Sequence, residues 1–314
     1  MKKNITNYKK IEIVNRQNPI LLFLKNIRYL FKYSLKQMYK EPNINIGEVT
    51  ELAAIKTRFI WDEIKVPKIK NDMETIHELV NTNKSIIRFG NGEINLMLGE
   101  DSLFEPANDF IKNTFKEIFY NNDEDLLTGT RYDMFRINTN FMHSNINTFR
   151  LQYFLTHYEK MKELYNYNKT YYSACFVYPY NIYEEWDLDE QFDEMRKIWS
   201  CKNITVIAGS RVFKNIKYNV FDNAHSISYI YGPNMNALQK YDELKEKIFN
   251  VSKDNILIFA LGPCGKILAY NAYKSGYRVL DMGHLIKNYD FYKKRDLMSV
   301  KEFKNNFRTF MKPD

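Results

Sequence analysis

The chain contains few cysteines, few glycines and no long apolar run. Its three cysteines, Cys175, Cys201 and Cys264, lie far apart within 314 residues. This spacing provides neither a Cys-x-x-Cys zinc pair nor the even set typical of a disulfide framework, so we expect a reducing, cytoplasmic environment. The longest early apolar run, residues 20–24, is far shorter than the roughly 20 residues that cross a bilayer. No apolar segment directly follows the charged N-terminus, so we expect neither export nor a transmembrane segment.

The charge of the chain is unbalanced, with a formal net charge of +8. An excess of positive charge favours an anionic partner, such as a nucleotide, an acidic glycan, an anionic lipid surface or nucleic acid. The sequence lacks a run of Lys and Arg interleaved with aromatics, and it lacks the spacing of a zinc finger. We therefore expect no nucleic-acid partner.

A basic stripe recurs at three- and four-residue spacing in residues 19–40, where it consists of Lys25, Arg28, Lys32, Lys36 and Lys40. Apolar residues occupy much of the remaining surface, so the pattern predicts an amphipathic helix. Such a helix can lie on an anionic membrane, here the inner face, or it can pack on the protein with its lysines in water. Both alternatives stay open. We expect a helical extension over residues 1–65 and the main domain over residues 66–314.

The main domain alternates apolar strands with amphipathic helices. A helix is expected at residues 73–80 and a strand at residues 85–89, whereas residues 105–200 have irregular periodicity and a mostly helical character. In the last third the runs NITVIAGS, SISYIYGP, DNILIFALGP and YRVLDMGH predict strands, with helices between them. The pattern predicts an α/β fold with a Rossmann-like, mostly parallel sheet and helices on both faces.

Small and polar residues follow the carboxyl end of each predicted strand of this series. The clusters are GNGE, AGSR, GPNMNA, GPCGK and DMGH. Because open parallel sheets bind ligands outside the carboxyl ends of their strands, we expect the clusters to converge on one ligand crevice. The chain has only 11 glycines, and two of them, Gly90 and Gly92, flank Asn91 just before Glu93. Taken alone, that stretch is equally typical of a tight turn.

Two of these clusters have residues suited to catalysis or phosphate binding. In GPCGK, Gly262 and Gly265 allow close backbone approach, and the helix that follows offers free N–H groups to a diphosphate. The cluster matches neither a P-loop nor G-x-G-x-x-G, and a Gly-Pro turn that merely opens a helix stays open as an alternative. In DMGH, Asp281 and His284 can face the same crevice, where His284 is able to take a proton near neutral pH.

These motifs together resemble the GT-D-type glycosyltransferases of bacterial surface-glycan and glycoprotein pathways. The resemblance rests on IIRFGNGE, on KNITVIAGSR, and on LIFALGPCGKILAYNAYKSGYRVLDMGH, and it covers about residues 70–293. It implies transfer of a hexose, glucose in the best-known member, from a UDP-sugar to a glycan or glycoprotein acceptor. It also implies assistance by a divalent metal, Mn²⁺ or Mg²⁺.

The resemblance also implies roles for particular residues. Glu93 stands at the Glu of the family's RFGDGE metal motif, while Asn91 replaces its Asp, which implies weaker metal binding. Asp281 and His284 match the family's D-x-GH and are the expected catalytic residues. The sequence does not distinguish inversion from retention of the anomeric centre, and His284 is the expected base if the reaction inverts. Further along, Asn288 replaces a Glu of the acidic stretch that usually follows.

The remaining expected site residues would bind the donor. They are Arg88, Gly90, Gly92, Arg211, Gly262, Pro263, Gly265 and Lys266, of which the arginines and the GPCGK amides would neutralise charge on the leaving phosphate. Arg88 can instead pair with a neighbouring carboxylate. Because Asn91 replaces Asp, a nucleotide-binding protein without catalysis is the alternative function. A methyltransferase is less favoured, because its Gly-rich first loop and acidic ribose partner are missing.

Overall fold

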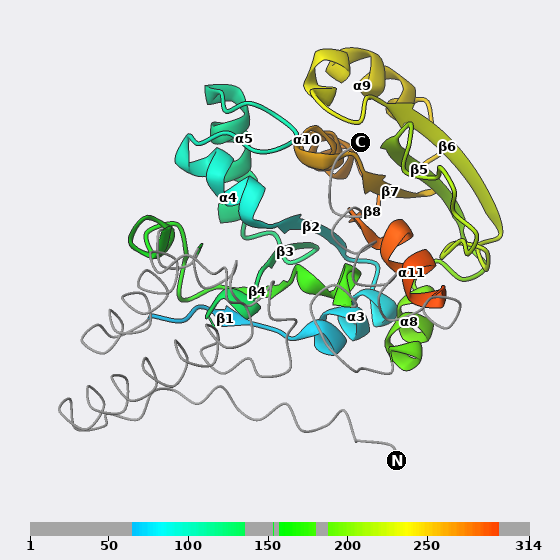
Figure 1. Ribbon diagram of the computed structural model, residues 1–314, viewed down its shortest axis with the longest axis horizontal. Helices are drawn as coiled ribbons and strands as arrows, with labels where there is room; N and C mark the ends of the chain where they lie inside the picture. Colours follow the sequence, from blue (N-terminus) through cyan, green and yellow to red (C-terminus); the bar gives the residue numbers. More distant parts are fainter. Residues whose placement is uncertain (1–64, 136–152, 154–156, 180–187, 295–314) are drawn as a thin grey trace, which may run out of the picture.

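The computed structural model describes residues 65–135, 153, 157–179 and 188–294 (Figure 1). The basic stripe of residues 19–40 lies outside these ranges, so the helix expected there and the division between residues 65 and 66 stay predictions. The described strands form one eight-stranded sheet in the order β1-β4-β3-β2-β8-β7-β5-β6. Every pairing between neighbours is parallel. The expected α/β fold with a parallel sheet is therefore confirmed.

The first half of the domain builds one side of the sheet. Its elements are β1 (Lys68–Ile69), α3 (Asp72–Asn81), β2 (Ser85–Phe89), α4 (Asn91–Leu98), α5 (Asp109–Tyr120), β3 (Leu126–Thr130), the 3₁₀ turn η1 (Asp133–Phe135), β4 (Thr170–Ser173) and η2 (Cys175–Val177). The second half builds the other side. Its elements are α8 (Asp189–Arg196), β5 (Asn203–Gly209), β6 (Ser226–Gly232), η3 (Ala237–Lys240), α9 (Tyr241–Phe249), β7 (Ile256–Ala260), α10 (Gly262–Lys274), β8 (Val279–Asp281) and α11 (Leu285–Lys293).

Local chemistry explains where several helices begin. Asn71 caps α3, because its side chain accepts from the Glu74 amide at 2.9 Å while the Glu74 carboxylate accepts from the Asn71 amide at 2.8 Å. Asn108 caps α5 in the same way, accepting from the amide of Ile111 at 2.9 Å. Helix α10 opens with Gly262 at φ +59° and then Pro263, whose missing N–H costs nothing in a first turn.

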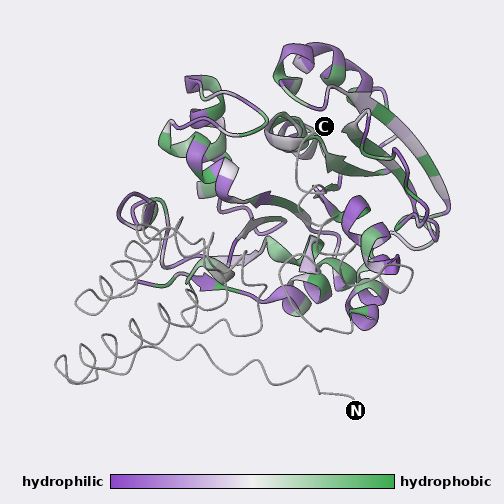
Figure 2. Cartoon of the chain, viewed as in Figure 1, coloured by the Kyte–Doolittle hydropathy of each residue, from purple (hydrophilic) through white to green (hydrophobic). Residues whose placement is uncertain are grey.

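Helices cover both faces of the sheet, and each face has its own apolar core. On one face α4, α5, α9 and α10 pack together in a cluster that includes Ile87, and on the other α3, α8 and α11 pack in a cluster that includes Ile86. Neighbouring residues of β2 thus enter opposite cores, as the two-residue period of a strand requires. Figure 2 shows hydrophobic residues along the central strands and mixed polarity on the outer helices. None of the helices in the described ranges is long and apolar enough to cross a membrane.

The mostly helical interpretation of residues 105–200 was wrong in part. Helices α5 and α8 occur there, but the same region also contains the strands β3 and β4. All five residues of β3 are buried. A strand that is covered on both faces does not alternate polar with apolar residues, so its sequence lacks the two-residue signal. The tyrosine-rich run that begins at Tyr171 contains most of β4 and all of η2.

Candidate active site

The five predicted clusters lie side by side at one edge of the sheet. They follow the carboxyl ends of β2, β8, β7, β5 and β6, which are five successive neighbours in the parallel sheet. The chain leaves β7 toward β8 on one side and leaves β5 toward β6 on the other. Ligands of open α/β sheets bind where successive connections diverge in this way. The topology thus places the candidate site at this edge, beside the ends of β7 and β5.

Lys266 joins three elements at this edge by bridging two carboxylates. Its Nζ atom lies 3.2 Å from Oε1 of Glu93 in α4 and 3.0 Å from Oδ2 of Asp281 at the end of β8. The Lys266 side chain is only 7% exposed. Burial disfavours its charged form, but the two carboxylates outweigh that effect and raise the pKa of Lys266. Lys266 is therefore a buried cation near neutral pH.

Arg88 and Asp281 form the floor of the site. Asp281 accepts from the Arg88 amide at 3.0 Å and from Nη2 of Arg88 at 3.1 Å. Arg88 donates further through Nε to the Asp281 carbonyl at 2.6 Å and through Nη1 to the Ala174 carbonyl at 2.9 Å. Burial opposes the charged form of Asp281, yet Arg88 and Lys266 hold its pKa below the usual range. Arg88 thus pairs with a carboxylate, and its expected contact with the donor stays a prediction, as does catalysis by Asp281.

Glycines make this floor possible. A Cβ atom on Gly283 would lie 2.3 Å from Nη2 of Arg88, and Gly283 also has φ +42°. A Cβ on Gly129 in β3 would lie 2.9 Å from Cγ of Arg88. Only residues without a side chain leave room for the Arg88 guanidinium here. Packing against Arg88 thus explains why Gly283, the glycine of DMGH, lacks a side chain.

The GNGE segment starts α4 without a left-handed turn. Gly90 is extended at φ −95°, and its amide donates to Oε2 of Glu93 at 2.8 Å, which closes the first turn of the helix. Neither Gly90 nor Gly92 has a positive φ. A tight turn that needs a left-handed residue therefore does not explain this pair of glycines. Asn91 accepts through Oδ1 from Nη1 of Arg131 at 3.2 Å.

The expected metal ligands do not fit a divalent cation in this arrangement. A divalent cation beside a diphosphate takes one or two protein carboxylates and completes its ligand shell with phosphate oxygens and water, so the protein oxygens have to be open to it. Here Oε1 of Glu93 faces the Lys266 ammonium, Oε2 accepts from an amide, and Oδ1 of Asn91 accepts from Arg131. Within the described ranges no three or more His, Cys, Asp or Glu side chains are grouped to hold a metal. This arrangement disagrees with the metal binding by Asn91 and Glu93 that the resemblance implies, and such binding stays a prediction of the resemblance alone.

GPCGK is the first turn of a helix and not a loop in front of one. Helix α10 already begins at Gly262, so its first free N–H groups and the positive end of its dipole lie at this glycine. Gly262 is partly exposed, whereas Gly265 is buried, and a Cβ on Gly265 would lie 3.1 Å from Cβ of Leu261. Gly265 therefore serves helix packing in this structure. Pro263 is also buried, so Gly262 is the part of the motif that stays partly exposed.

His284 lies at the start of α11 with its side chain exposed. Its ring centroid is 6.3 Å from that of Phe104, which also approaches Gly262. The protein around the ring, and then the charges of Arg88, Lys287 and Lys266, lower the pKa of His284 below its usual range. The ring remains accessible to solvent, and the three cations beside it set the direction of the shift in its pKa. A neutral His284 is able to accept a proton near neutral pH.

Comparison with known proteins identifies the family. The profile of the glycosyltransferase GT-D fold matches residues 86–307, more than half of the chain. The chain belongs to this family. A solved glycosyltransferase of Streptococcus sanguinis has a TM-score of 0.67 at 23% identity, covering 72% of this chain and 85% of that one. A second solved structure, described as a conserved domain with a distinct glycosyltransferase fold, also has a TM-score of 0.67, at 25% identity over 72% of this chain and 82% of that one.

Two curated streptococcal proteins are similar in sequence over much of this GT-D chain. The glycosyltransferase GlyD of Streptococcus pneumoniae is 24% identical over 90% of this chain, and the probable glycosyl transferase Gly of Streptococcus gordonii is 23% identical over 70%. The matches span 34% and 32% of those proteins. The chain therefore spans about a third of the length of these relatives.

The sequence did not single out Arg131 and Phe104, which the structure brings to the GT-D site. Arg131 follows the carboxyl end of β3 after a small-residue run, TGTR, much as Arg211 follows AGSR. It was missed because β3 itself was missed. Arg211 is exposed after β5, which β8 and β7 separate from β2 in the sheet. Its amide donates to Oδ1 of Asn234 at 3.1 Å.

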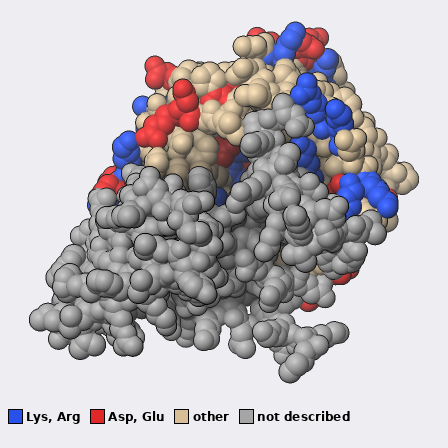
Figure 3. Space-filling view, in the orientation of Figure 1, with Lys and Arg blue, Asp and Glu red and all other residues tan. Residues whose placement is uncertain are grey.

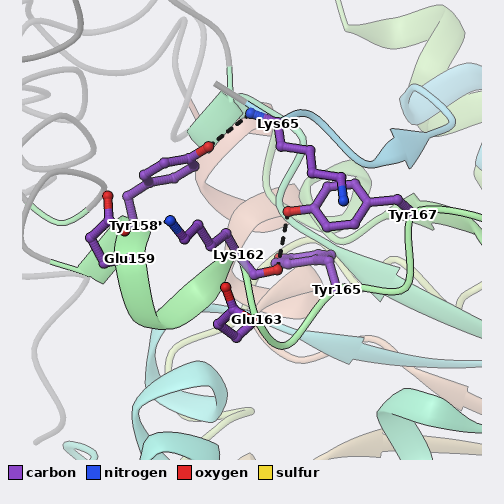
Figure 4. A pocket seen from close by; sticks show the side chains of 7 residues that line it. All are labelled: Lys65, Tyr158, Glu159, Lys162, Glu163, Tyr165 and Tyr167. Atoms are coloured by element: carbon purple, nitrogen blue, oxygen red, sulfur yellow. Dashed lines mark hydrogen bonds and ion pairs between the residues drawn. The ribbon is translucent and has the colours of Figure 1, made fainter. Parts of the chain in front are cut away.

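A pocket of about 680 Å³ lies beside the segments that lead into β1 and β4 (Figure 4). Its lining consists of Lys65, Tyr158, Glu159, Lys162, Glu163, Tyr165 and Tyr167. Figure 3 shows small interspersed groups of basic and acidic side chains on the face in view. The absence of a nucleic-acid partner stays a prediction.

Proposed function

We propose that this chain transfers a hexose from a UDP-sugar to a glycan or glycoprotein acceptor in bacterial surface-glycan synthesis. Membership of the GT-D family supports the reaction class. The observation that carries the assignment to this edge is the Lys266 bridge between Glu93 and Asp281 beside the start of α10. A buried cation next to free helix N–H groups is suited to a diphosphate.

In the proposed donor step, the diphosphate lies at the start of α10. Cleavage of the sugar from UDP builds negative charge on the leaving phosphate, and fixed positive groups stabilise that charge as it develops. Among the described residues, the amide end of α10 at Gly262, the Lys266 ammonium and the Arg131 guanidinium are groups that can do so. Arg88 contributes by holding Asp281, which in turn orients Lys266.

In the proposed acceptor step, His284 takes the proton of the attacking hydroxyl. The lowered pKa keeps the ring neutral, which is the form that accepts a proton. Phe104 beside it offers an apolar face of the kind that packs against sugar rings. The proposal includes a cytoplasmic location with attachment to the inner membrane face through residues 19–40. Flotation with anionic liposomes tests the attachment, and binding lost on deleting residues 19–40 is the expected result.

A second function, nucleotide binding without catalysis, is favoured by two asparagines. Asn91 and Asn288 occupy positions where the resemblance implies carboxylates. Asn288 is fully buried, and neither polar atom of its side chain has a hydrogen-bond partner in the described part of the chain.

Turnover separates these two functions. The chain is incubated with UDP-hexoses, and release of UDP is measured with and without added glycan acceptor. Wild type should release UDP, and Glu93→Gln should release much less. The matched control is Glu117→Gln, an exposed carboxylate that pairs with Lys274 in the last turn of α10. UDP binding without any release would instead establish the second function, and failure to bind UDP would refute both.

A further inference from the structure

We propose that this chain binds the donor diphosphate without a divalent metal, with Lys266 and Arg131 supplying the positive charge in its place. The inference rests on the proposed function, because it concerns the same donor. The first observation concerns the side-chain oxygen atoms of the two expected metal ligands. Glu93 and Asn91 provide one carboxylate and one amide, and all three of their side-chain oxygens already accept from N–H groups or face an ammonium.

The orientation of the Asn91 amide favours an anion over a cation. Because Arg131 donates to Oδ1 at 3.2 Å, the amide group is fixed with Nδ2 on its other side. That Nδ2 atom is buried and has no hydrogen-bond partner among the described residues. A buried donor without a partner is costly, and a phosphate oxygen is the ligand that would satisfy it. A metal ion at the same position would meet the positive end of an N–H dipole.

The charges of the site also favour an anion over a metal ion. Three cations, Arg88, Lys266 and Arg131, accompany two carboxylates, Glu93 and Asp281. With an aspartate at position 91, Arg131 would face a carboxylate, and the six positions would carry three charges of each sign. With asparagine there, Arg131 faces a neutral amide. Asparagine thus makes this edge one charge unit more positive than aspartate would, and that difference replaces part of what a metal supplies.

Arg131 is placed to act together with Lys266. It follows β3, the sheet neighbour of β2, and it contacts the first residue of α4. Lys266 contacts Glu93, which lies in the same turn of α4. The two cations therefore contact side chains two residues apart in the first turn of one helix. A guanidinium is also the cation best matched to phosphate, because it offers paired donors in one plane.

The first experiment measures metal binding alone. The free-ion electron paramagnetic resonance signal of Mn²⁺ is titrated with wild type, with Asn91→Asp and with the matched control Asn95→Asp, one turn further along α4. Wild type and Asn95→Asp should leave the signal unchanged, whereas Asn91→Asp should reduce it. An acidic residue in the first turn of a helix is favourable, so Asn91→Asp should fold. Saturable binding of Mn²⁺ by wild type would overturn the inference.

The second experiment measures UDP affinity by calorimetry, in EDTA and then with Mn²⁺. The Kd of wild type should change by less than about twofold, and Arg131→Gln should weaken binding in EDTA about tenfold. Asn91→Asp should bind UDP weakly in EDTA and regain affinity with Mn²⁺. If wild type binds UDP only with Mn²⁺, the inference fails while the proposed function stands. If it binds UDP in neither condition, the proposed function fails, and pyrophosphate then serves as the probe: binding in EDTA supports the inference, and no binding refutes it.

Discussion

Replacing Lys266 by methionine should destabilise the protein strongly. Lys266 is buried, and its ammonium lies between the carboxylates of Glu93 and Asp281 at 3.2 and 3.0 Å. Methionine fills a similar volume but leaves two buried carboxylates with less compensating charge. Removing one partner of a buried ion pair costs about 3–5 kcal/mol. Because Arg88 still pairs with Asp281, we expect the lower end, about 3 kcal/mol in the free energy of unfolding.

Urea unfolding followed by circular dichroism measures this loss. Lys274→Met is the matched control, because Lys274 lies on the same helix in a half-exposed pair with Glu117 and should cost at most about 1 kcal/mol. Adding Glu93→Gln to Lys266→Met should restore part of the stability, since it removes one of the uncompensated charges. A loss below about 1 kcal/mol for Lys266→Met would refute the buried-cation reasoning.

The pH dependence of wild type follows from the same cluster. The pKa of Asp281 is lowered in the folded state, so its contribution is present above the unfolded value of about 3.9 and is lost as the pH falls through the folded value. The pKa of Lys266 is raised, so its contribution is present below about 10.4 and is lost as the pH rises through the folded value. Gly283→Ala should cost about 2 kcal/mol or more, because its Cβ would lie 2.3 Å from Arg88 Nη2 at φ +42°; an unchanged Tm would contradict this. His284→Asn should lower kcat and abolish the acidic limb of the pH–rate profile, whereas an unchanged profile would exclude His284 as the base.

Much of the sheet was predictable because its strands carry strong local signals. SIIRF was predicted at residues 85–89, where β2 is found, and the runs NITVIAGS and SISYIYGP predicted β5 and β6. In these segments apolar runs end at small residues, and that local pattern is enough to predict a strand. The parallel order then brings their carboxyl ends to one edge. β3 carries the weaker signal LLTGT, and the arginine after it was missed with it.

The pairings within the site could not be predicted, because they depend on contacts between distant segments. Arg88 and Asp281 are 193 positions apart, and only the adjacency of β2 and β8 brings them together. The same holds for Lys266, which reaches both Glu93 and Asp281. Sequence pattern identified which residues gather at the edge. It did not distinguish those that hold the floor, such as Arg88, from those that can meet a ligand.

In the proposed function, the cations of this edge hold the donor diphosphate at the start of α10. Calorimetric titration with UDP of wild type, Lys266→Met and the control Lys274→Met, each first shown to be folded, tests it most directly. We expect saturable binding by wild type and by Lys274→Met, and binding weaker by about tenfold or more in Lys266→Met. Equal UDP affinity in all three proteins, or no UDP binding by wild type, would contradict the account.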